Sequence, residues 1–288
     1  MASTETPKDS GRKLFYGLFI FPLLIAVGMA VLLCTVVLLT RETETPESLI
    51  AAIKTGSPSK RWQKAFELSN ELNQGRGLIR EAGLMHEIIH IVNDRAQYDA
   101  KTRSFMAVAL ARFEEPEAAA ALEKALHEEA DADVQLHLIW ALGVRKFAPA
   151  REFVGTFLGA ERDDLKVMAA YVLGVLGDPA SRQNIAPLLN DDDRDVRWNA
   201  ALSLARLGSD EGYQEILKMM DRKTLSSLPD LSDSQIEEIM VNAVKGAALL
   251  HRGETLSAVQ RLAQEDPSLK VRQTALEVLQ HPTETIAA

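Results

Sequence analysis

The chain repeats itself with a period of 31 residues, and this internal repeat limits the possible folds more than any other feature of the sequence. The segments DVQLHLIWALG, DLKVMAAYVLG and DVRWNAALSLA begin at Asp133, Asp164 and Asp195, so their starts are 31 residues apart each time. A period of about 20 to 50 residues indicates an array of similar units that bury a shared core only when they are stacked. We therefore expect a solenoid.

The same period extends to both sides of these three segments. Upstream, KTRSFMAVALARFEEPE from Lys101 aligns with DLKVMAAYVLGVLGDPA at an offset of 63 residues, which is two units. Downstream, VNAVKGAALL from Val241 aligns with WNAALSLARL at an offset of 43, so about 12 residues have been inserted, and LKVRQTALEVL from Leu269 matches the unit again. The repeat predicts a solenoid over residues 57–281 with an insertion at 222–234.

Each unit is predicted to form two helices. In the first helix, apolar residues recur at helical spacing, as at Val196, Ala200 and Leu204, and a glycine or polar turn follows. The second helix is shorter, as at 184–189 or 213–220, and closes in an acidic turn. The expected fold class is all-α, with six helix pairs and a final lone helix. The first helices are expected to begin near residues 57, 99, 131, 162, 193, 233 and 268.

The residues of the unit carry a family resemblance. Residues 164–179 follow the pattern D-x-x-x-x-A-A-x-x-L-G-x-L-G-D-P, and Asp195 to Arg197 read DVR. Over roughly 99–281 the chain resembles HEAT repeats of the short bacterial, phycobilisome-lyase-like kind. The resemblance implies a right-handed α-solenoid in which Asp195 and Arg197 take part in a hydrogen-bonded ladder between units. It implies a fold and not a chemistry.

A long apolar segment precedes the repeats. No charged residue occurs in 14–40, and the segment exceeds the ~20 residues needed to cross a bilayer. It is also longer than the ~7–15 residue core of a signal peptide. We predict an N-terminal tail at 1–13, a transmembrane helix at 14–40 that contacts the lipid bilayer, a spacer with a short helix at 41–56, and a C-terminal tail at 282–288.

Basic residues near the apolar segment predict its orientation. Lys8, Arg12 and Lys13 precede it, whereas only Arg41 and Lys54 follow it closely. Because loops rich in Lys and Arg stay in the cytoplasm, the expected N-terminus is cytoplasmic and the solenoid lies outside. The prediction is a single-pass protein of the cell membrane, which in a bacterium is the inner membrane, with the solenoid in the periplasm.

The charge and the cysteine count exclude several classes of protein. Asp and Glu number 41 against 32 Lys and Arg, giving a formal net charge of −9. Such an acidic chain repels phosphate, so we expect no nucleic-acid partner. The single cysteine, Cys34, lies in the apolar segment and excludes an internal disulfide and a Cys-rich zinc site.

One short motif points to metal chemistry. His86, Glu87 and His90 form the pattern H-E-x-x-H of zinc metallopeptidases, in which two imidazoles one helical turn apart bind zinc and the glutamate acts as general base. A third ligand is needed, and Glu114 or Glu115 occurs without a recognisable ligand motif. In a helical frame the three residues share the polar face. We interpret them as solvent-facing side chains of a solenoid helix, and keep a zinc site as the alternative.

Two other metal hypotheses have less support. His86-Glu87 and His127-Glu128 resemble the His-Glu pairs of deoxyhypusine hydroxylase, a HEAT-repeat iron enzyme, but that family needs four pairs in matching units. The acidic run at 190–195 lacks the glycine and the distal glutamate of a calcium loop. We expect Asp192 or Asp193 to cap the next helix instead.

The insertion offers a candidate contact surface. Its sequence, RKTLSSLPDLSDS, places Leu225, Leu228 and Leu231 in a polar context, and insertions in solenoids often lie on the binding face. It is either a tolerated loop or a docking segment with exposed leucines. Together these observations predict a membrane-tethered, non-catalytic scaffold that binds a protein partner and needs no cofactor. The alternatives are a membrane-anchored zinc metallopeptidase, or an accessory of a cofactor lyase, which only the family resemblance suggests.

Overall fold

The computed structural model describes residues 16–39, 45–75, 82–250 and 252–280. Over these residues the chain forms helices and turns and no strand, which confirms the expected all-α class. The chain divides into two compact units, residues 1–48 and residues 49–288, which are described separately below.

The first unit contains one long apolar helix. A π-helical turn, η1 (Tyr16–Ile20), leads into α2 (Phe21–Leu39). The stretch Gly17–Val36 is long and apolar enough to cross a membrane, and its large apolar side chains are exposed. A signal sequence near an N-terminus has the same length and composition, so the helix fits either role.

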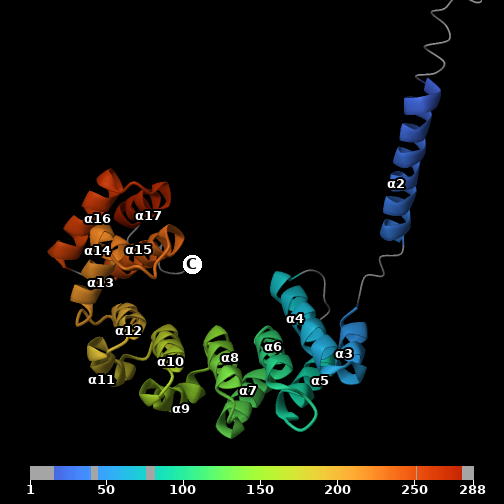
Figure 1. Ribbon diagram of the computed structural model, residues 1–288. Helices are drawn as coiled ribbons and strands as arrows, with labels where there is room; N and C mark the ends of the chain where they lie inside the picture. Colours follow the sequence, from blue (N-terminus) through green and yellow to red (C-terminus); the bar gives the residue numbers. More distant parts are fainter. Residues whose placement is uncertain (1–15, 40–44, 76–81, 251, 281–288) are drawn as a thin grey trace, which may run out of the picture. The chain divides into compact units, whose positions relative to one another are not determined.

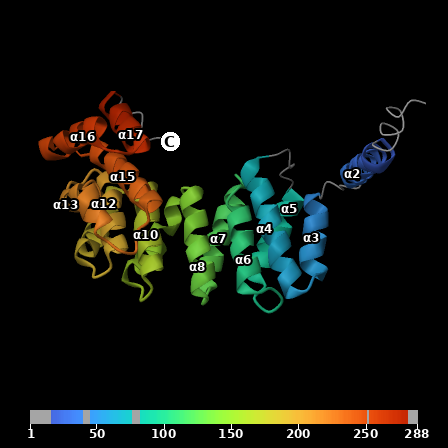
Figure 2. The same cartoon turned by 45° about the horizontal axis from the view of Figure 1, so that its top comes forward.

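The second unit is a stack of helical hairpins (Figure 1). One helix of each hairpin, here called the A helix, packs beside the A helices of neighbouring hairpins, as both views show (Figure 2). Each A helix begins within one residue of its expected start. The A helices are α4 (Pro58–Gln74), α6 (Ala100–Leu110), α8 (Ala132–Val144), α10 (Asp163–Leu176), α12 (Arg194–Arg206), α15 (Asp233–Ala248) and α17 (Leu269–Gln280).

The second helices of the hairpins, here called B helices, form the other layer. Several are short and continue into 3-10 turns. They are α5 (Ala82–Asn93), α7 (Pro116–Glu128), α9 (Arg151–Thr156) with η2 (Ala148–Ala150) and η3 (Phe157–Gly159), α11 (Arg182–Ile185) with η4 (Pro179–Ser181) and η5 (Ala186–Asn190), α13 (Tyr213–Met219) and α16 (Gly253–Glu265).

Local hydrogen bonds determine where the A helices begin. The side chain of Asp99 accepts the Thr102 N–H at 3.0 Å, and Asp131 caps α8 in the same way. Asp193 accepts the N–H groups at the start of α12, which confirms the expected cap. Such caps satisfy donors that have no partner inside the helix.

The helix that precedes the first hairpin belongs to the core. In α3 (Pro46–Thr55), the side chains of Leu49, Ile50 and Ile53 are buried in the same hydrophobic cluster as the repeats. The compact unit therefore begins at Leu49, inside the segment 41–56 that was predicted as a spacer with a short helix.

The core consists of two hydrophobic clusters that meet at α12. The first extends from Leu49 to Leu207 and the second from Trp198 to Val278. Helix α12 contributes to both, because Ala200 faces the first cluster and Ala201 the second. The period is interrupted directly after this helix pair, so the insertion and the boundary between the clusters lie together.

Glycines at equivalent positions let neighbouring A helices approach closely. A Cβ on Gly143 would lie 2.7 Å from Val172 Cγ2, and a Cβ on Gly174, one period later, would lie 2.9 Å from Ser203 Cβ. Both distances are shorter than packed side chains allow. The Leu-Gly pair in the repeat therefore has a packing role.

We expect Gly174→Ala to lower the free energy of unfolding by about 1–3 kcal/mol, because the new methyl group overpacks the contact between α10 and α12. Urea denaturation of the detergent-solubilised chain, followed by circular dichroism, measures the change. The matched control is Gly155→Ala in α9, where a Cβ meets no atom within 4 Å. Equal stability of the two variants would contradict the close approach.

Candidate protein-binding surface

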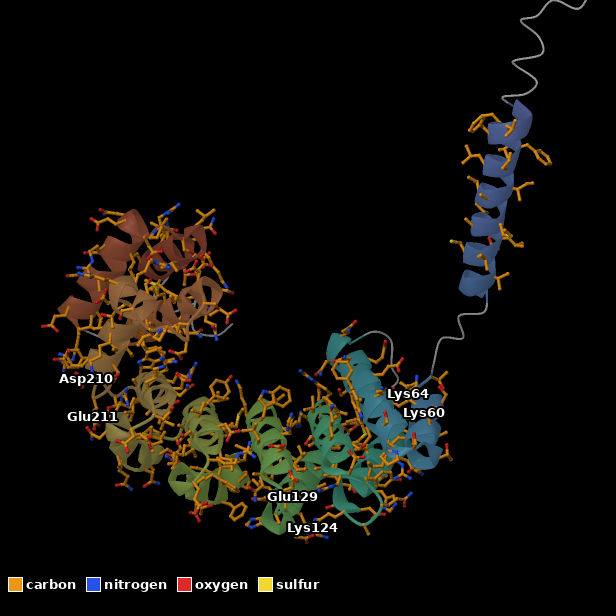
Figure 3. All side chains as sticks on the ribbon, in the orientation of Figure 1. Lys60, Lys64, Lys124, Glu129, Asp210 and Glu211 are labelled. Atoms are coloured by element: carbon orange, nitrogen blue, oxygen red, sulfur yellow. The ribbon has the colours of Figure 1, made fainter. Side chains whose placement is uncertain are left out.

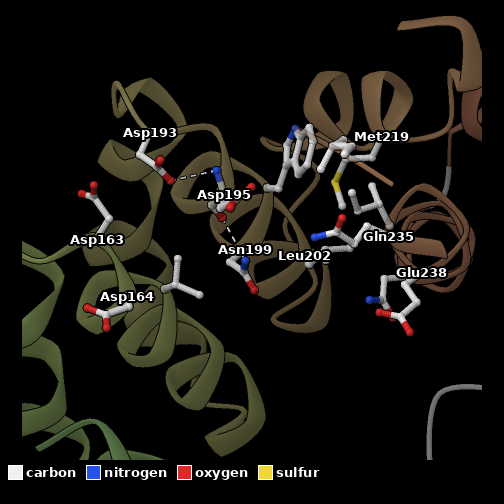
Figure 4. A pocket seen from close by; sticks show the side chains of 14 residues that line it. Asp163, Asp164, Asp193, Asp195, Asn199, Leu202, Met219, Gln235 and Glu238 are labelled. Carbon is white, nitrogen blue, oxygen red and sulfur yellow. Dashed lines mark hydrogen bonds between the residues drawn. The ribbon is translucent and has the colours of Figure 1, made fainter. Parts of the chain in front are cut away.

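A pocket of about 480 Å³ opens where α10, α12 and α15 meet (Figure 4). Three successive units supply its lining, together with Met219 of α13 and Leu231 of the insertion. The volume lies within the ~300–1,000 Å³ of typical ligand sites. The pocket lies beside the insertion, where the spacing of the repeats changes.

The rim of the pocket is acidic. Five carboxylates line it, and no lysine or arginine among the residues that the structure describes does so. Asp163 and Asp164 lie on one side and Glu238 lies on the other (Figure 4). Asp193 and Asp195 come from the start of α12. The pocket therefore presents negative charge at both ends.

The cations near the rim do not neutralise it. Each of three cations is shared between one carboxylate of the pocket and one carboxylate outside it. The sets are Arg162 with Asp164 and Asp133, Lys166 with Asp163 and Asp191, and Arg194 with Asp195 and Asp230. Within the described residues, Asp193 and Glu238 have no cationic partner. Negative charge is therefore in excess around the pocket.

Ion pairs lower the pKa of one carboxyl of the pocket and of one carboxyl beside it. Hydrogen bonds from Arg162 hold the pKa of the Asp164 carboxyl below its usual value. The Lys166 ammonium lies 2.9 Å from an Asp191 oxygen and lowers the pKa of that carboxyl in the same way. A carboxyl with a lowered pKa stays charged at more acidic pH. The Asp164 carboxyl at the rim is thus anionic over the physiological range.

The floor of the pocket is apolar, and amides line its walls. Trp198 and Leu202 are each 8% exposed, and Met219 is buried. The amide side chains are Asn199, Gln235 and Asn242. Carboxylates bind ammonium and guanidinium groups, and an apolar floor accommodates the carbon chain of a long cationic side chain. The arrangement suits recognition of a cation, and the described residues that line it include no histidine, serine or cysteine.

The two residues expected in the ladder, Asp195 and Arg197, both lie near the turn before α12. Arg197 donates to the carbonyl oxygens of Asp191 and Asp192, at 2.6 and 2.8 Å, and so closes the turn before its own helix. The Asp195 side chain pairs with the adjacent Arg194, which also binds Asp230 of the insertion. Its side chain lies in the exposed first turn of α12, and its ladder role stays a prediction.

The carboxylates that link units lie three residues before the first residue of the next A helix. Glu129, Asp191 and Asp266 each accept N–H groups of their own turn. Each also binds a cation from an earlier part of the stack. The three pairs are Arg103 with Glu129, Lys166 with Asp191, and Arg222 with Asp266. Glu129 and Asp191 are 62 residues apart in the sequence, which is two periods. This spacing could have identified them as equivalent residues from the sequence alone.

The H-E-x-x-H residues lie on the polar side of α5. His86 and His90 are exposed, and the His86 Nε2 atom lies 3.2 Å from a Glu117 carboxylate oxygen. Glu87 forms an ion pair with Lys54. The described residues contain no group of three or more side chains that could hold a metal ion. The structure thus confirms the polar face and brings neither Glu114 nor Glu115 to the two histidines as a ligand group.

The insertion is an ordered part of the stack. It contains α14 (Arg222–Ser226), whose Leu225 is fully buried, so the expectation of an exposed Leu225 is wrong. The reason is that α14 packs against α13 and α15 and turns Leu225 into the second cluster. Leu228 and Leu231 are half-buried against the same cluster, and only Leu231 lines the pocket.

Known proteins and solved structures share sequence and fold features with this chain. Residues 152–228 match the model of the HEAT repeats family. The structure is similar to the complex of CpcE and CpcF of phycocyanin lyase from Nostoc sp. PCC7120, with 17% identity, a TM-score of 0.56, and coverage of 86% of this chain and 96% of that one. No curated protein matches the sequence.

Two further solved structures show a weaker likeness. Human deoxyhypusine hydroxylase in complex with glycerol has 13% identity and a TM-score of 0.35, with 84% of each chain covered. A designed armadillo repeat protein has 17% identity and a TM-score of 0.34, with 84% of this chain and 100% of that chain covered.

The matched family model and the stacked hairpins agree on the same segment. Residues 152–228 include α10 and α12, the helices in which the 31-residue period is clearest. At 17% identity, the likeness to CpcE and CpcF is one of fold. The chain therefore contains HEAT repeats at residues 152–228, within a domain that is folded as an α-solenoid.

Proposed function

We propose that this chain is a membrane-tethered, non-catalytic scaffold that binds a protein partner through the A-helix surface of its HEAT-repeat domain. The observation that carries the proposal is the pocket at α10, α12 and α15, which combines an acidic rim, wall amides and an apolar floor. In a solenoid each unit packs only on its neighbours, so such a surface stays available to a partner.

The apolar helix α2 supports the tether. Its span Gly17–Val36 has the length of a bilayer crossing, and its exposed apolar side chains suit lipid. The basic residues Lys8, Arg12 and Lys13 before the span favour a cytoplasmic N-terminus with the solenoid on the opposite side. We accordingly propose the cell membrane as the location, and in a bacterium the periplasm as the compartment of the repeats.

The contacts of the H-E-x-x-H residues support a non-catalytic role without zinc. A zinc peptidase needs its glutamate directed at a metal-bound water, whereas Glu87 is engaged with Lys54. His86 pairs with Glu117, which lies on the next B helix. A role as accessory of a cofactor lyase has only the fold likeness to CpcE and CpcF behind it, and we do not adopt it.

Purification of the full chain from its own membranes tests the proposal. We expect a C-terminal affinity tag to recover one protein in comparable amount, and Asp195→Lys with Glu238→Lys to lose it, because the double change reverses charge at the pocket. The control is Asp192→Lys with Glu277→Lys, which makes the same change in net charge at exposed positions outside the pocket. Recovery of no protein under several extraction conditions would count against the scaffold.

A further inference from the structure

The carboxylates of the pocket are arranged in two groups with apolar surface between them. Asp163 and Asp164 extend from the start of α10, and Glu238 lies opposite on α15 (Figure 4). Leu202 lies between these groups and its helix also supplies Trp198. A ligand that satisfies this surface needs a positive charge at each end and an apolar group in the middle.

The wall amides add a requirement for hydrogen-bonding groups. The Asn199 side-chain N–H donates to the Asp195 carbonyl at 2.9 Å, which leaves the amide oxygen of Asn199 to accept. The Gln235 amide oxygen accepts from the Ser232 N–H at 2.9 Å, which leaves the amide N–H groups of Gln235 to donate. A spare acceptor and a spare donor match the N–H and C=O groups of a peptide bond.

The alternatives to a peptide satisfy fewer of these groups. Nucleic acid is repelled by the excess carboxylates. A polyamine matches the charges but has no carbonyl for the spare Gln235 N–H groups and no side chain for the floor. A metal ion needs ligands that converge, and the described residues contain no such group.

We infer that the pocket binds a basic segment of the partner protein, in which two Lys or Arg residues flank an apolar residue. This inference rests on the proposed scaffold function and names the chemistry of its partner. The two basic side chains bind the carboxylates on opposite sides of the pocket, and the apolar side chain lies over Trp198 and Leu202. The backbone of the segment pairs with the amides of Asn199 and Gln235.

Peptide binding to the full chain in detergent tests the inference. The probe is a fluorescein-labelled peptide, GSKLKLKSG, and fluorescence anisotropy reports its binding. We expect saturable binding that weakens by about tenfold or more in Asp163→Asn with Glu238→Gln, because the charged hydrogen bonds on both sides of the pocket are lost. The control, Asp192→Asn with Glu277→Gln, removes the same charge elsewhere and should retain the affinity within about twofold.

Two further probes separate the competing explanations. The peptide GSKSKSKSG lacks the apolar residues and should bind more weakly by about tenfold, and GSELELESG should not bind. Equal weakening in both double variants would overturn the inference, since it would indicate charge alone. Displacement by spermine as effective as by GSKLKLKSG would also overturn it, in favour of a small cation. If a partner contacts the pocket but GSKLKLKSG does not compete with it, the inference fails while the scaffold stands.

Discussion

Replacing Glu129 with alanine is expected to lower the free energy of unfolding by about 3–5 kcal/mol, because it leaves a buried cation without its partner. Glu129 is 8% exposed and binds Arg103, which is 5% exposed. The same carboxylate accepts the N–H groups of Ala130 and Asp131, at 3.0 and 2.9 Å, so its loss also opens the turn between two units. Urea denaturation of the detergent-solubilised chain measures the change.

The adjacent residue provides the control for this prediction. Glu128 is exposed and binds Arg95 at 3.2 Å, so Glu128→Ala should cost at most about 1 kcal/mol. Arg103→Met with Glu129→Leu removes both charges and should be more stable than Glu129→Ala alone. If the double variant were the least stable, the unpaired charge would not be the cause of the loss.

Leu225→Ala is expected to lower the free energy of unfolding by about 2–5 kcal/mol, because it removes a fully buried side chain from the second hydrophobic cluster. A loss of this size would show that the insertion is part of the folded core and is not a detachable docking loop. The change should not affect the A helices of the first cluster, such as α6, because their contacts lie elsewhere. Circular dichroism during urea denaturation again reports the stability.

An exposed leucine serves as the matched control. Leu256 lies in α16 with 51% of its surface exposed, so Leu256→Ala should change stability by no more than about 0.5 kcal/mol. Leu228→Ala should fall between the two variants, since Leu228 is half-buried. Equal, small effects at Leu225 and Leu256 would restore Leu225 as an exposed contact residue.

The architecture could be predicted because its determinants are local. Apolar spacing and a capping residue act over a short stretch of sequence. The start of α12 beside Asp193 could therefore be predicted from a few adjacent residues. The short helix at α3 also followed from its proline and its apolar spacing. Its burial in the core did not, since that depends on distant helices.

The irregular B helices were less accessible to prediction. The expected helix at 184–189 is divided in the structure into α11 and the 3-10 turn η5. Pro187 lies at the start of η5 and lacks the N–H that an α-helix needs at that point. The stacking of neighbouring units still accommodates this broken helix, as the buried Ile185 and Leu188 show.

The candidate site could not be predicted, because its residues meet only in the folded stack. Asp164 and Glu238 are far apart in sequence and lie on opposite sides of one pocket in the folded stack. The leucines of the insertion did point to the correct region, since Leu231 lines the pocket. The burial of Leu225 was missed, because the polar residues around it did not indicate a helix. In the structure Leu225 faces inward from α14.

A site-specific photo-crosslink in native membranes tests the central claim most directly. A photoreactive residue replaces Gln235, which lines the pocket, or Lys124, which lies exposed on α7 away from it (Figure 3). We predict one discrete adduct from position 235, lost on adding excess GSKLKLKSG, and none from position 124. No adduct at 235, or the same adducts from both positions, would contradict a partner-binding surface at α10, α12 and α15.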